Sequence, residues 1–194
     1  MAKDNFLWFP TAATGGLLSA KATQPEGEST DDWFSKKKAV EINSWSFGLS
    51  HAESGGSGTT GSGMGRVKFD EFQVEKDVDQ ASCPLFQAVV AGAHYPHLML
   101  ISRKAGGSNL LFLQFAFVQV FCTGISWSGG SGEENAKETI KFKFGAMSVQ
   151  YIQQMAGGGE GKKMIASWSA NQNTPTTDVT GLSAPPAFMD GSQA

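Results

Sequence analysis

Hydrophobic and polar positions alternate along much of this chain, and this pattern predicts β-strands that each bury one face. One stretch, residues 110–121, is apolar on both faces, which is typical of a central strand covered on both sides. The expected strands are residues 5–9, 39–50, 66–76, 98–104, 110–121, 140–151 and 164–171. The pattern therefore predicts a mainly β protein.

Three of these strands change phase midway. In residues 39–50 a bulge near Asn43 would reconcile the two phases. Residues 66–76 repeat the change, and residues 140–151 shift phase past Gly145. Strands of this kind commonly pass from one layer to another or turn the corner of a barrel.

A single short helix interrupts the strands at residues 82–92. Ser82 is a suitable N-cap, Pro84 lies in the first turn, where its missing N–H costs nothing, and Gly92 stands at the C-terminal stop. The expected buried stripe of the helix consists of Leu85, Phe86, Val89 and Val90.

The composition supports one soluble domain and argues against nucleic-acid or membrane partners. The 194 residues include 24 glycines and carry a formal charge of −3, which suits many tight turns and disfavours a nucleic-acid interface. The only basic run is Lys36, Lys37 and Lys38, which we expect to form a solvated strand edge. The longest apolar run contains Gln114 and Gln119 and is too short to span a bilayer.

Cysteine usage and the N-terminus indicate synthesis in the cytoplasm. Nothing in the sequence brings Cys83 and Cys122 together, so we expect both to be reduced and buried. Pro10, Gly15 and Gly16 interrupt the apolar core that a signal peptide requires.

A glycine-rich loop at residues 51–65 imitates a nucleotide-binding motif. Gly56, Gly58 and Gly61 match the G-x-G-x-x-G pattern, but a strand beginning at Arg66 follows them instead of a helix that could hold a pyrophosphate. We therefore expect a long polar hairpin loop, whose length makes it a candidate for contacting a partner.

Other candidate sites lack the residues that their chemistry needs. Residues 157–163 fail the phosphate-loop spacing, and Cys83 begins an apolar helix, which disfavours a nucleophile there. His94 and His97 lack further metal ligands nearby, so a turn held by Pro96 is favoured. Adjacent carboxylates lie in polar loops, where adjacency usually signals solvation: Asp31, Asp32, Glu133 and Glu134. We predict no catalytic residue, no cofactor and no metal.

Several short sequence motifs occur in the same order and at comparable spacing as in a known protein family. They are GEST at 27–30, SWSFG at 44–48, the glycine loop leading into GRV, DQASCPLFQAVVAGAHYP at 79–96, LISRKAGG at 100–107 and TGISWSGGSGEE at 123–134, with a final strand around Trp168. Together they resemble the haemolysin-coregulated proteins (Hcp), the tube subunits of bacterial type VI secretion systems. The resemblance extends over roughly residues 2–173. HYP followed by RKAGG, with the turn at 129–132, is its most specific part.

The resemblance implies a small β-barrel of two antiparallel sheets with one flanking helix, assembled as a homo-hexamer. Such rings stack into a tube that a contracting sheath drives outward with effectors inside, so the implied partners are effectors, sheath and tip proteins, without nucleic acid or membrane insertion. Members are non-enzymatic unless fused to a toxin domain. The resemblance also implies that the protein is made and assembled in the cytoplasm and is then secreted without a cleaved signal peptide. Residues 1–174 would form the tube domain and residues 175–194 a flexible C-terminal tail.

The resemblance also suggests functional surfaces. Strand alternation places Trp45 and Phe47 towards the barrel core, so Ser44 and Ser46 would face the lumen and its cargo. The glycine loop would dock stacked rings; its residues are Ser54, Gly55, Gly56, Ser57, Gly58, Thr59, Thr60, Gly61, Ser62, Gly63, Met64 and Gly65. Residues 14–24 are longer than the family pattern, and their role and that of the tail stay open, as does the choice between a type VI tube and a related phage-like injection particle.

A second hypothesis is a monomeric β-sandwich module that binds a ligand such as a glycan. Trp8, Trp33 or Trp127 would then serve as a stacking platform. Exposed rings near the glycine loops would favour this alternative, whereas burial at subunit contacts would count against it.

Overall fold

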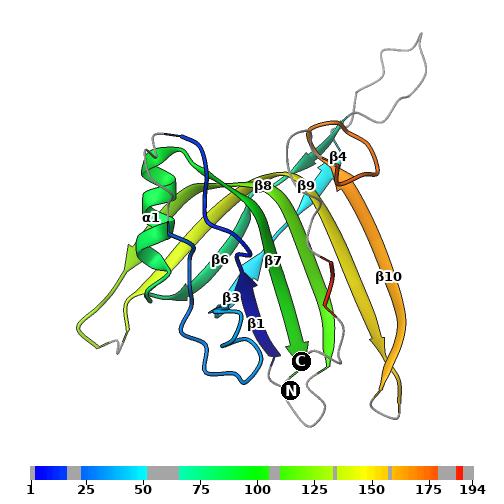
Figure 1. The fold of residues 1–194 in the computed structure, drawn as a ribbon, viewed down its shortest axis with the longest axis horizontal. Helices are drawn as coiled ribbons and strands as arrows, with labels where there is room; N and C mark the ends of the chain where they lie inside the picture. The colour runs from blue at the N-terminus through cyan, green and yellow to red at the C-terminus, as the bar shows by residue number, and fades with distance from the viewer. Residues whose placement is uncertain are drawn as a thin grey trace.

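The computed structural model describes residues 3–16, 23–51, 66–104, 110–132, 135–156, 159–178 and 187–189. Within them the chain forms ten strands and one helix (Figure 1). The strands are β1 (Lys3–Trp8), β2 (Val40–Glu41), β3 (Ser44–Ser46), β4 (Leu49–His51), β5 (Val67–Phe69), β6 (Phe72–Asp77), β7 (His94–Lys104), β8 (Leu111–Ser128), β9 (Lys137–Gln154) and β10 (Glu160–Ser169), and the helix is α1 (Ser82–Ala91).

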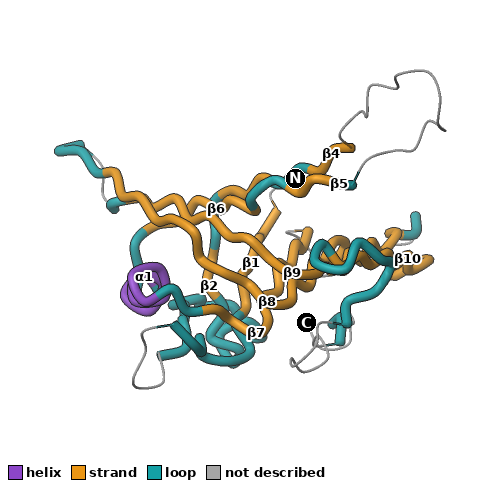
Figure 2. Tube along the Cα trace, turned by 90° about the horizontal axis from the view of Figure 1, so that it is seen from above, coloured by secondary structure: helices purple, strands orange, loops and turns teal. Residues whose placement is uncertain are grey.

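Eight strands form one curled antiparallel sheet. Its order is β2-β1-β7-β8-β9-β6-β3, with β10 paired on β9, while β4 and β5 form a separate two-stranded sheet. Because β9 is 18 residues long, its first half pairs with β6 and its second half with β10. Figure 2 shows the curl of the large sheet beside α1. The predicted mainly β fold with two antiparallel sheets and one flanking helix is confirmed, and the large sheet closes partway, as a half-barrel.

A kink crosses the three central strands at aligned positions. The register of β7, β8 and β9 places Pro96, Gln119 and Gly145 side by side. Pro96 has no N–H for the ladder, Gln119 has a φ of 54°, and a Cβ at Gly145 would lie 2.6 Å from the Gln119 side-chain oxygen. Beyond this line the side chains change face, so Phe142 and Met147 both belong to the larger hydrophobic cluster of the protein, which we call the main core. The phase shift predicted past Gly145 is therefore confirmed.

The other two predicted phase changes are breaks between strands. Residues 39–50 form β2, β3 and β4, which pair with β1, β6 and β5 respectively. Residues 66–76 divide in the same way into β5 and β6. The change of face therefore follows a change of partner strand, and the single bulged strand expected near Asn43 is wrong.

Two hydrophobic clusters lie on opposite faces of the large sheet. The larger one fills the inside of the curl and includes Leu100 of β7, Phe142 of β9 and Leu85 of α1. The second, which we call the outer cluster, takes the alternate positions of β7, such as Met99 and Ile101. Each fully buried side chain of this size contributes about 1.5–3 kcal/mol, so both faces of the central strands stabilise the fold.

The helix begins differently from the prediction. Ser82 is not the N-cap, because it is the first helical residue and its hydroxyl donates to Glu138 Oε1 at 2.8 Å. Asp79 organises the start of the helix instead, accepting the Ala81 N–H on Oδ1 at 2.8 Å. Gly92 ends the helix with a φ of 64°, as expected for a left-handed stop.

The buried stripe of α1 is rotated from its expected position. Leu85 and Ala88 are buried, whereas Phe86 is 45% and Val90 60% exposed. Cys83 is exposed as well, contrary to expectation. The buried positions Ser82, Leu85, Ala88 and Ala91 follow a 3-residue spacing, and Val89 of the expected stripe is half-buried against the main core.

The lysine run 36–38 lies in a turn, so the predicted strand edge is wrong. Residues 32–38 form a turn, in which Lys38 has a φ of 52°. The Lys37 ammonium lies 4.8 Å from the ring centre of Trp8 and 5.6 Å from that of Trp33. This turn covers part of the outer cluster.

Candidate functional site

The predicted lumen residues lie on an exposed face of β3. Ser44 and Ser46 are exposed, while Trp45 and Phe47 pack against the main core. The Ser44 hydroxyl donates to Glu75 Oε2 at 2.9 Å. The alternation inferred from SWSFG is therefore present, and the orientation of this face towards a channel stays a prediction.

The predicted stacking loop, Ser54–Gly65, lies outside the described residues. The β4–β5 hairpin leads into it, with His51 and Val67 as the last pair. The Arg66 guanidinium donates to the carbonyl of Asn171 at 3.0 Å, which ties the foot of the loop to the end of β10. The loop therefore starts from a fixed base.

An open apolar groove lies between this hairpin and β9–β10. Its volume is about 320 Å³. The apolar lining consists of Leu49, Val67, Phe69, Met147, Val149, Ala166 and Trp168. Leu49 is 59% exposed, so the groove presents apolar surface to solvent beside the loop.

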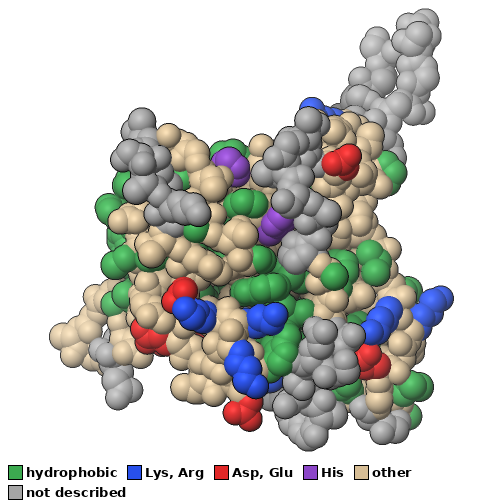
Figure 3. All heavy atoms as spheres, viewed as in Figure 1, with side chains coloured by type: hydrophobic (Ala, Val, Ile, Leu, Met, Phe, Trp, Pro, Cys, Tyr) green, Lys and Arg blue, Asp and Glu red, His purple; other side chains and the backbone are tan. Residues whose placement is uncertain are grey.

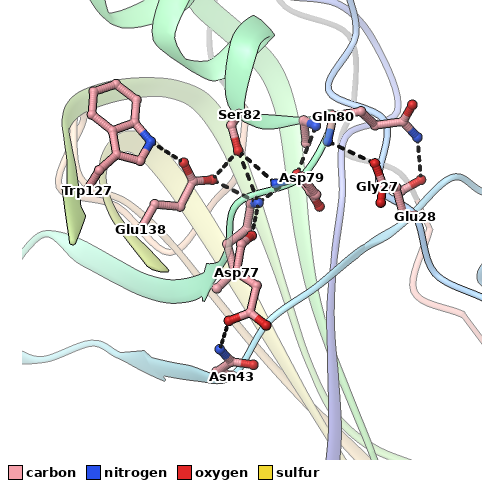
Figure 4. A network of polar contacts seen from close by, with 11 residues as sticks. Gly27, Glu28, Asn43, Asp77, Asp79, Gln80, Ser82, Trp127 and Glu138 are labelled. Carbon is pink, nitrogen blue, oxygen red and sulfur yellow. Dashed lines mark hydrogen bonds and ion pairs between the residues drawn. The ribbon is translucent and has the colours of Figure 1, made fainter. Parts of the chain in front are cut away.

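A buried ion cluster joins β6, β9 and the start of α1 (Figure 4). The Lys76 ammonium lies 2.8 Å from Glu138 Oε1 and 2.6 Å from Asp79 Oδ1. The side chains of Lys76 and Glu138 are both 0% exposed. Charges removed from water in this way are tolerated because they are paired and hydrogen-bonded.

Further donors occupy the remaining oxygens of the cluster. The Ser82 hydroxyl donates to Glu138 Oε1, and the Trp127 indole N–H donates to Glu138 Oε2, each at 2.8 Å. The Lys76 ammonium also donates to the Asp77 carbonyl at 2.7 Å. Both carboxylate oxygens of Glu138 are thus engaged, and the cluster positions α1 and Trp127 on the sheet.

The sequence contained a signal for this cluster that we missed. Lys76 follows Phe72 and Val74 on the buried phase of its strand, and Glu138 precedes Ile140 on the buried phase of β9. A cation and an anion on buried phases of strands indicate a buried pair, although only the tertiary structure shows that they meet.

One exposed apolar surface, which we call the helix patch, consists of Phe86, Val90 and Trp127. Their exposed fractions are 45%, 60% and 51%. The rings of Phe86 and Trp127 lie 6.0 Å apart between centroids. Since the Trp127 indole is held by the buried Glu138, the patch is a fixed surface.

Exposed apolar side chains also lie on both faces of the sheet at β10, at the side of the molecule where Figure 3 shows hydrophobic side chains at the surface. We call them the strand patch: Tyr151 and Met164 share one face, and Ile165 lies on the other. Tyr151 and Met164 are register partners on β9 and β10, and all three side chains are at least 43% exposed. Among the described strands β10 pairs with β9 alone. Its other edge therefore presents backbone N–H and C=O groups beside apolar side chains, which natural sheets normally cover.

Arg103 organises the loop that contains one of the predicted carboxylate pairs. Its guanidinium lies 2.6 Å from Asp31 Oδ2 and 3.1 Å from Asp4 Oδ2. Burial alone would raise the pKa of Asp31, but the hydrogen bonds from Arg103 and from the backbone N–H groups of Phe34 and Trp33 lower it below 3.8. Asp31 is therefore a structural anion, and the solvated pair expected there is wrong for this residue.

The cysteines and histidines offer no reactive constellation. No group of three metal-binding side chains occurs in the described part of the chain. Cys83 and Cys122 are both free, and burial raises the pKa of the Cys122 thiol to about 12. His94 and His97 belong to β7 rather than to the predicted turn, and Pro96 between them lies at the kink of this strand.

The aromatic residues of the alternative hypothesis are divided between two places. Trp8 and Trp33 are half-buried against the outer cluster, and Trp127 belongs to the helix patch.

No helix in the described ranges is both long and apolar enough to cross a membrane.

Comparison with known proteins gives consistent results. The family model described as "Type VI secretion system effector, Hcp" matches residues 18–151. Protein hcp1 of Pseudomonas aeruginosa is 31% identical over 110 residues, which are 56% of this chain and 68% of that protein. A solved "type six secretion system protein" superposes with a TM-score of 0.74 and 28% identity, covering 89% of this chain and 99% of its own. Hcp1 from Salmonella typhimurium superposes with a TM-score of 0.67 and 26% identity, covering 91% and 100%. None of these similarities supports the glycan-binding alternative.

Proposed function

The chain belongs to the Hcp family of type VI secretion system proteins, and we propose that its helix patch and strand patch join copies of it into a closed ring of six. The protein is a structural tube subunit of that secretion system. Its mechanism is steric and mechanical: the assembled wall encloses cargo, and the tube moves as a body.

The observation that carries the ring proposal is the placement of the two apolar surfaces. α1 and β10 lie at opposite ends of the longest axis of the molecule (Figure 1). Two different surfaces at opposite ends suit a head-to-tail contact, which closes into a ring when the rotation between neighbours allows it. The same contact would cover the open edge of β10.

The family supplies the finer parts of the proposal. Ser44 and Ser46 face the channel and its cargo, and Ser54–Gly65 dock one ring on the next. The apolar groove beside that loop would receive part of the adjoining copy. Secreted effectors, sheath and tip proteins are the further partners.

The cellular location of the protein follows from its proposed role as a tube subunit. It is made and assembled in the cytoplasm and leaves the cell through the apparatus without a cleaved signal peptide. As a tube subunit, the chain acts as structure and not as an enzyme.

Light scattering after gel filtration tests the ring directly. We expect a mass of six times 20.6 kDa, about 124 kDa, and rings in negatively stained electron micrographs. Ile165→Glu places a charge in the strand patch and should give monomers, while Val78→Glu, at a 43% exposed position outside both patches, should leave rings intact. A monomeric parent at high concentration, or rings formed by Ile165→Glu, would contradict the proposal.

A further inference from the structure

A glutamine interrupts the apolar central strand at a fully buried position. Gln114 of β8 is 0% exposed, and its register partner on β9, Gln150, is 5% exposed. The Gln114 side-chain nitrogen donates to Gln150 Oε1 at 3.2 Å. This contact fixes the orientation of the Gln114 amide and leaves its oxygen and part of its donor capacity for another partner.

That partner is the backbone of a residue 75 positions away along the chain. Gln114 Oε1 accepts the N–H of Met189 at 3.0 Å, and Gln114 Nε2 donates to the carbonyl of Met189 at 2.7 Å. One donor and one acceptor are thus offered to a single residue, as in a hydrogen-bonded pair of a β-ladder. These two hydrogen bonds recognise main chain, so preference for a particular side chain must come from the apolar surface beside them.

The side chain of the same residue is bound separately. Met189 is 6% exposed and belongs to the outer cluster with Leu111, Ala116 and Ile152. Phe188 packs against the edge of this cluster. The segment 187–189 is the short red piece beside β8 in Figure 1, so part of the region predicted as a flexible tail rests on the outer face of the sheet.

We propose that the outer face of β8 and β9 around Gln114 is a binding site for extended peptide, with residues 187–189 as its own tethered, releasable ligand. The site takes a main-chain N–H and C=O on the Gln114 amide and one unbranched apolar side chain in the outer cluster. The occupant is the segment of the same chain. The proposal is independent of ring formation, so its failure would leave the tube function untouched.

The number and kind of contacts make the ligand releasable. Among the described residues, two hydrogen bonds, the buried Met189 side chain and the half-buried Phe188 form a small interface. Tethering converts binding into an intramolecular step with an effective concentration on the order of millimolar. A weak site therefore stays filled by its own segment. The segment also lies beyond the family match, which ends at residue 151, whereas Gln114 and Gln150 lie inside it.

A synthetic peptide can test the site in the full-length protein. We would measure the fluorescence anisotropy of a labelled peptide with the sequence of residues 184–191, APPAFMDG. Met189→Ser should empty the site and raise peptide affinity at least about tenfold over the parent chain, because the tethered competitor is lost. Met155→Ser is the matched control, since Met155 is 56% exposed at the end of β9, and it should bind like the parent.

Two further measurements distinguish main-chain recognition from non-specific hydrophobic binding. Adding Gln114→Leu to Met189→Ser should abolish the gain, and so should a peptide N-methylated at the methionine amide, which needs no change in the protein. Equal binding of the methylated peptide, or no gain with Met189→Ser, would overturn the proposal. A change in the mass of the assembly caused by Met189→Ser would also overturn it, because the segment would then bridge two copies instead of binding within one.

Discussion

Removing the cation of the buried cluster should destabilise the subunit strongly. Lys76→Met keeps most of the side-chain length but leaves Glu138 and Asp79 without the ammonium that lies 2.8 and 2.6 Å from them. Both side chains of the Lys76–Glu138 pair are 0% exposed, so water cannot replace the lost partner.

The expected cost can be bounded from the structure. Removing one partner of a buried ion pair typically costs about 3–5 kcal/mol. Ser82 and Trp127 still donate to Glu138 in the variant, which places the expected loss near the lower end, about 3 kcal/mol. Domains have only about 5–15 kcal/mol of stability, so this loss is a large fraction.

Lys38 provides a control that differs in burial. Its ammonium lies 2.7 Å from Glu26 Oε1, but the two side chains are 58% and 39% exposed. Lys38→Met should therefore cost no more than about 1 kcal/mol, as exposed pairs do. A double variant, Lys76→Met with Glu138→Gln, should lose less than the sum of the single losses, because it removes the uncompensated charge.

Urea unfolding followed by tryptophan fluorescence measures these differences. All variants need the same protein concentration, since assembly adds to the measured stability by mass action. If Lys76→Met costs no more than Lys38→Met, then burial does not set the value of the pair and the reasoning fails.

Three further outcomes are expected. Ser46→Arg should leave the rings intact, because surface changes usually alter stability by no more than about 0.5 kcal/mol, and fewer effectors should co-purify with them. Loss of the rings would place Ser46 at an interface, and unchanged co-purification of effectors would place it away from the cargo-binding wall. Shortening Ser54–Gly65 to a two-residue turn should spare rings but weaken their stacking in electron micrographs, and tubes as long as those of the parent would speak against the loop as docking element. A maleimide at pH 8 should label Cys83 and spare Cys122, because the Cys122 thiol pKa of about 12 leaves only about one molecule in ten thousand as thiolate at that pH. The labelling rate of Cys122 should rise only as the pH approaches 12, and equal labelling of both cysteines at pH 8 would refute the prediction.

Local patterns predicted the elements wherever one strand or helix carries its own signal. The apolar run predicted a central strand at residues 110–121, and β8 does lie between β7 and β9. Its continuation to Ser128 was not predicted, because the register shifts between Cys122 and Gly124, where the apolar run is interrupted, and most of the added residues are exposed. They stay in the sheet because β9 supplies partners as far as the Ser128–Lys137 pair.

Patterns failed where a distant residue decides the local structure. The helix was placed correctly, but its buried face was not, since Ser82 is drawn inward by Glu138, 56 positions away. Phe86 then turns towards solvent although its type favours burial. A stripe read from hydrophobicity alone cannot include a polar residue whose partner lies on another strand.

The two glutamines of the central strand show the same limit most clearly. In the sequence Gln114 and Gln119 look alike, two polar interruptions of one apolar run. In the structure Gln119 bends the strand, with its side-chain oxygen accepting from Asn171 at 2.8 Å over Gly145. Gln114 stays in regular register with Gln150 and binds the backbone of Met189. A buried amide costs free energy unless its hydrogen bonds are met, so the buried Gln114 implies a partner, and the identity of that partner is information that only the folded chain contains.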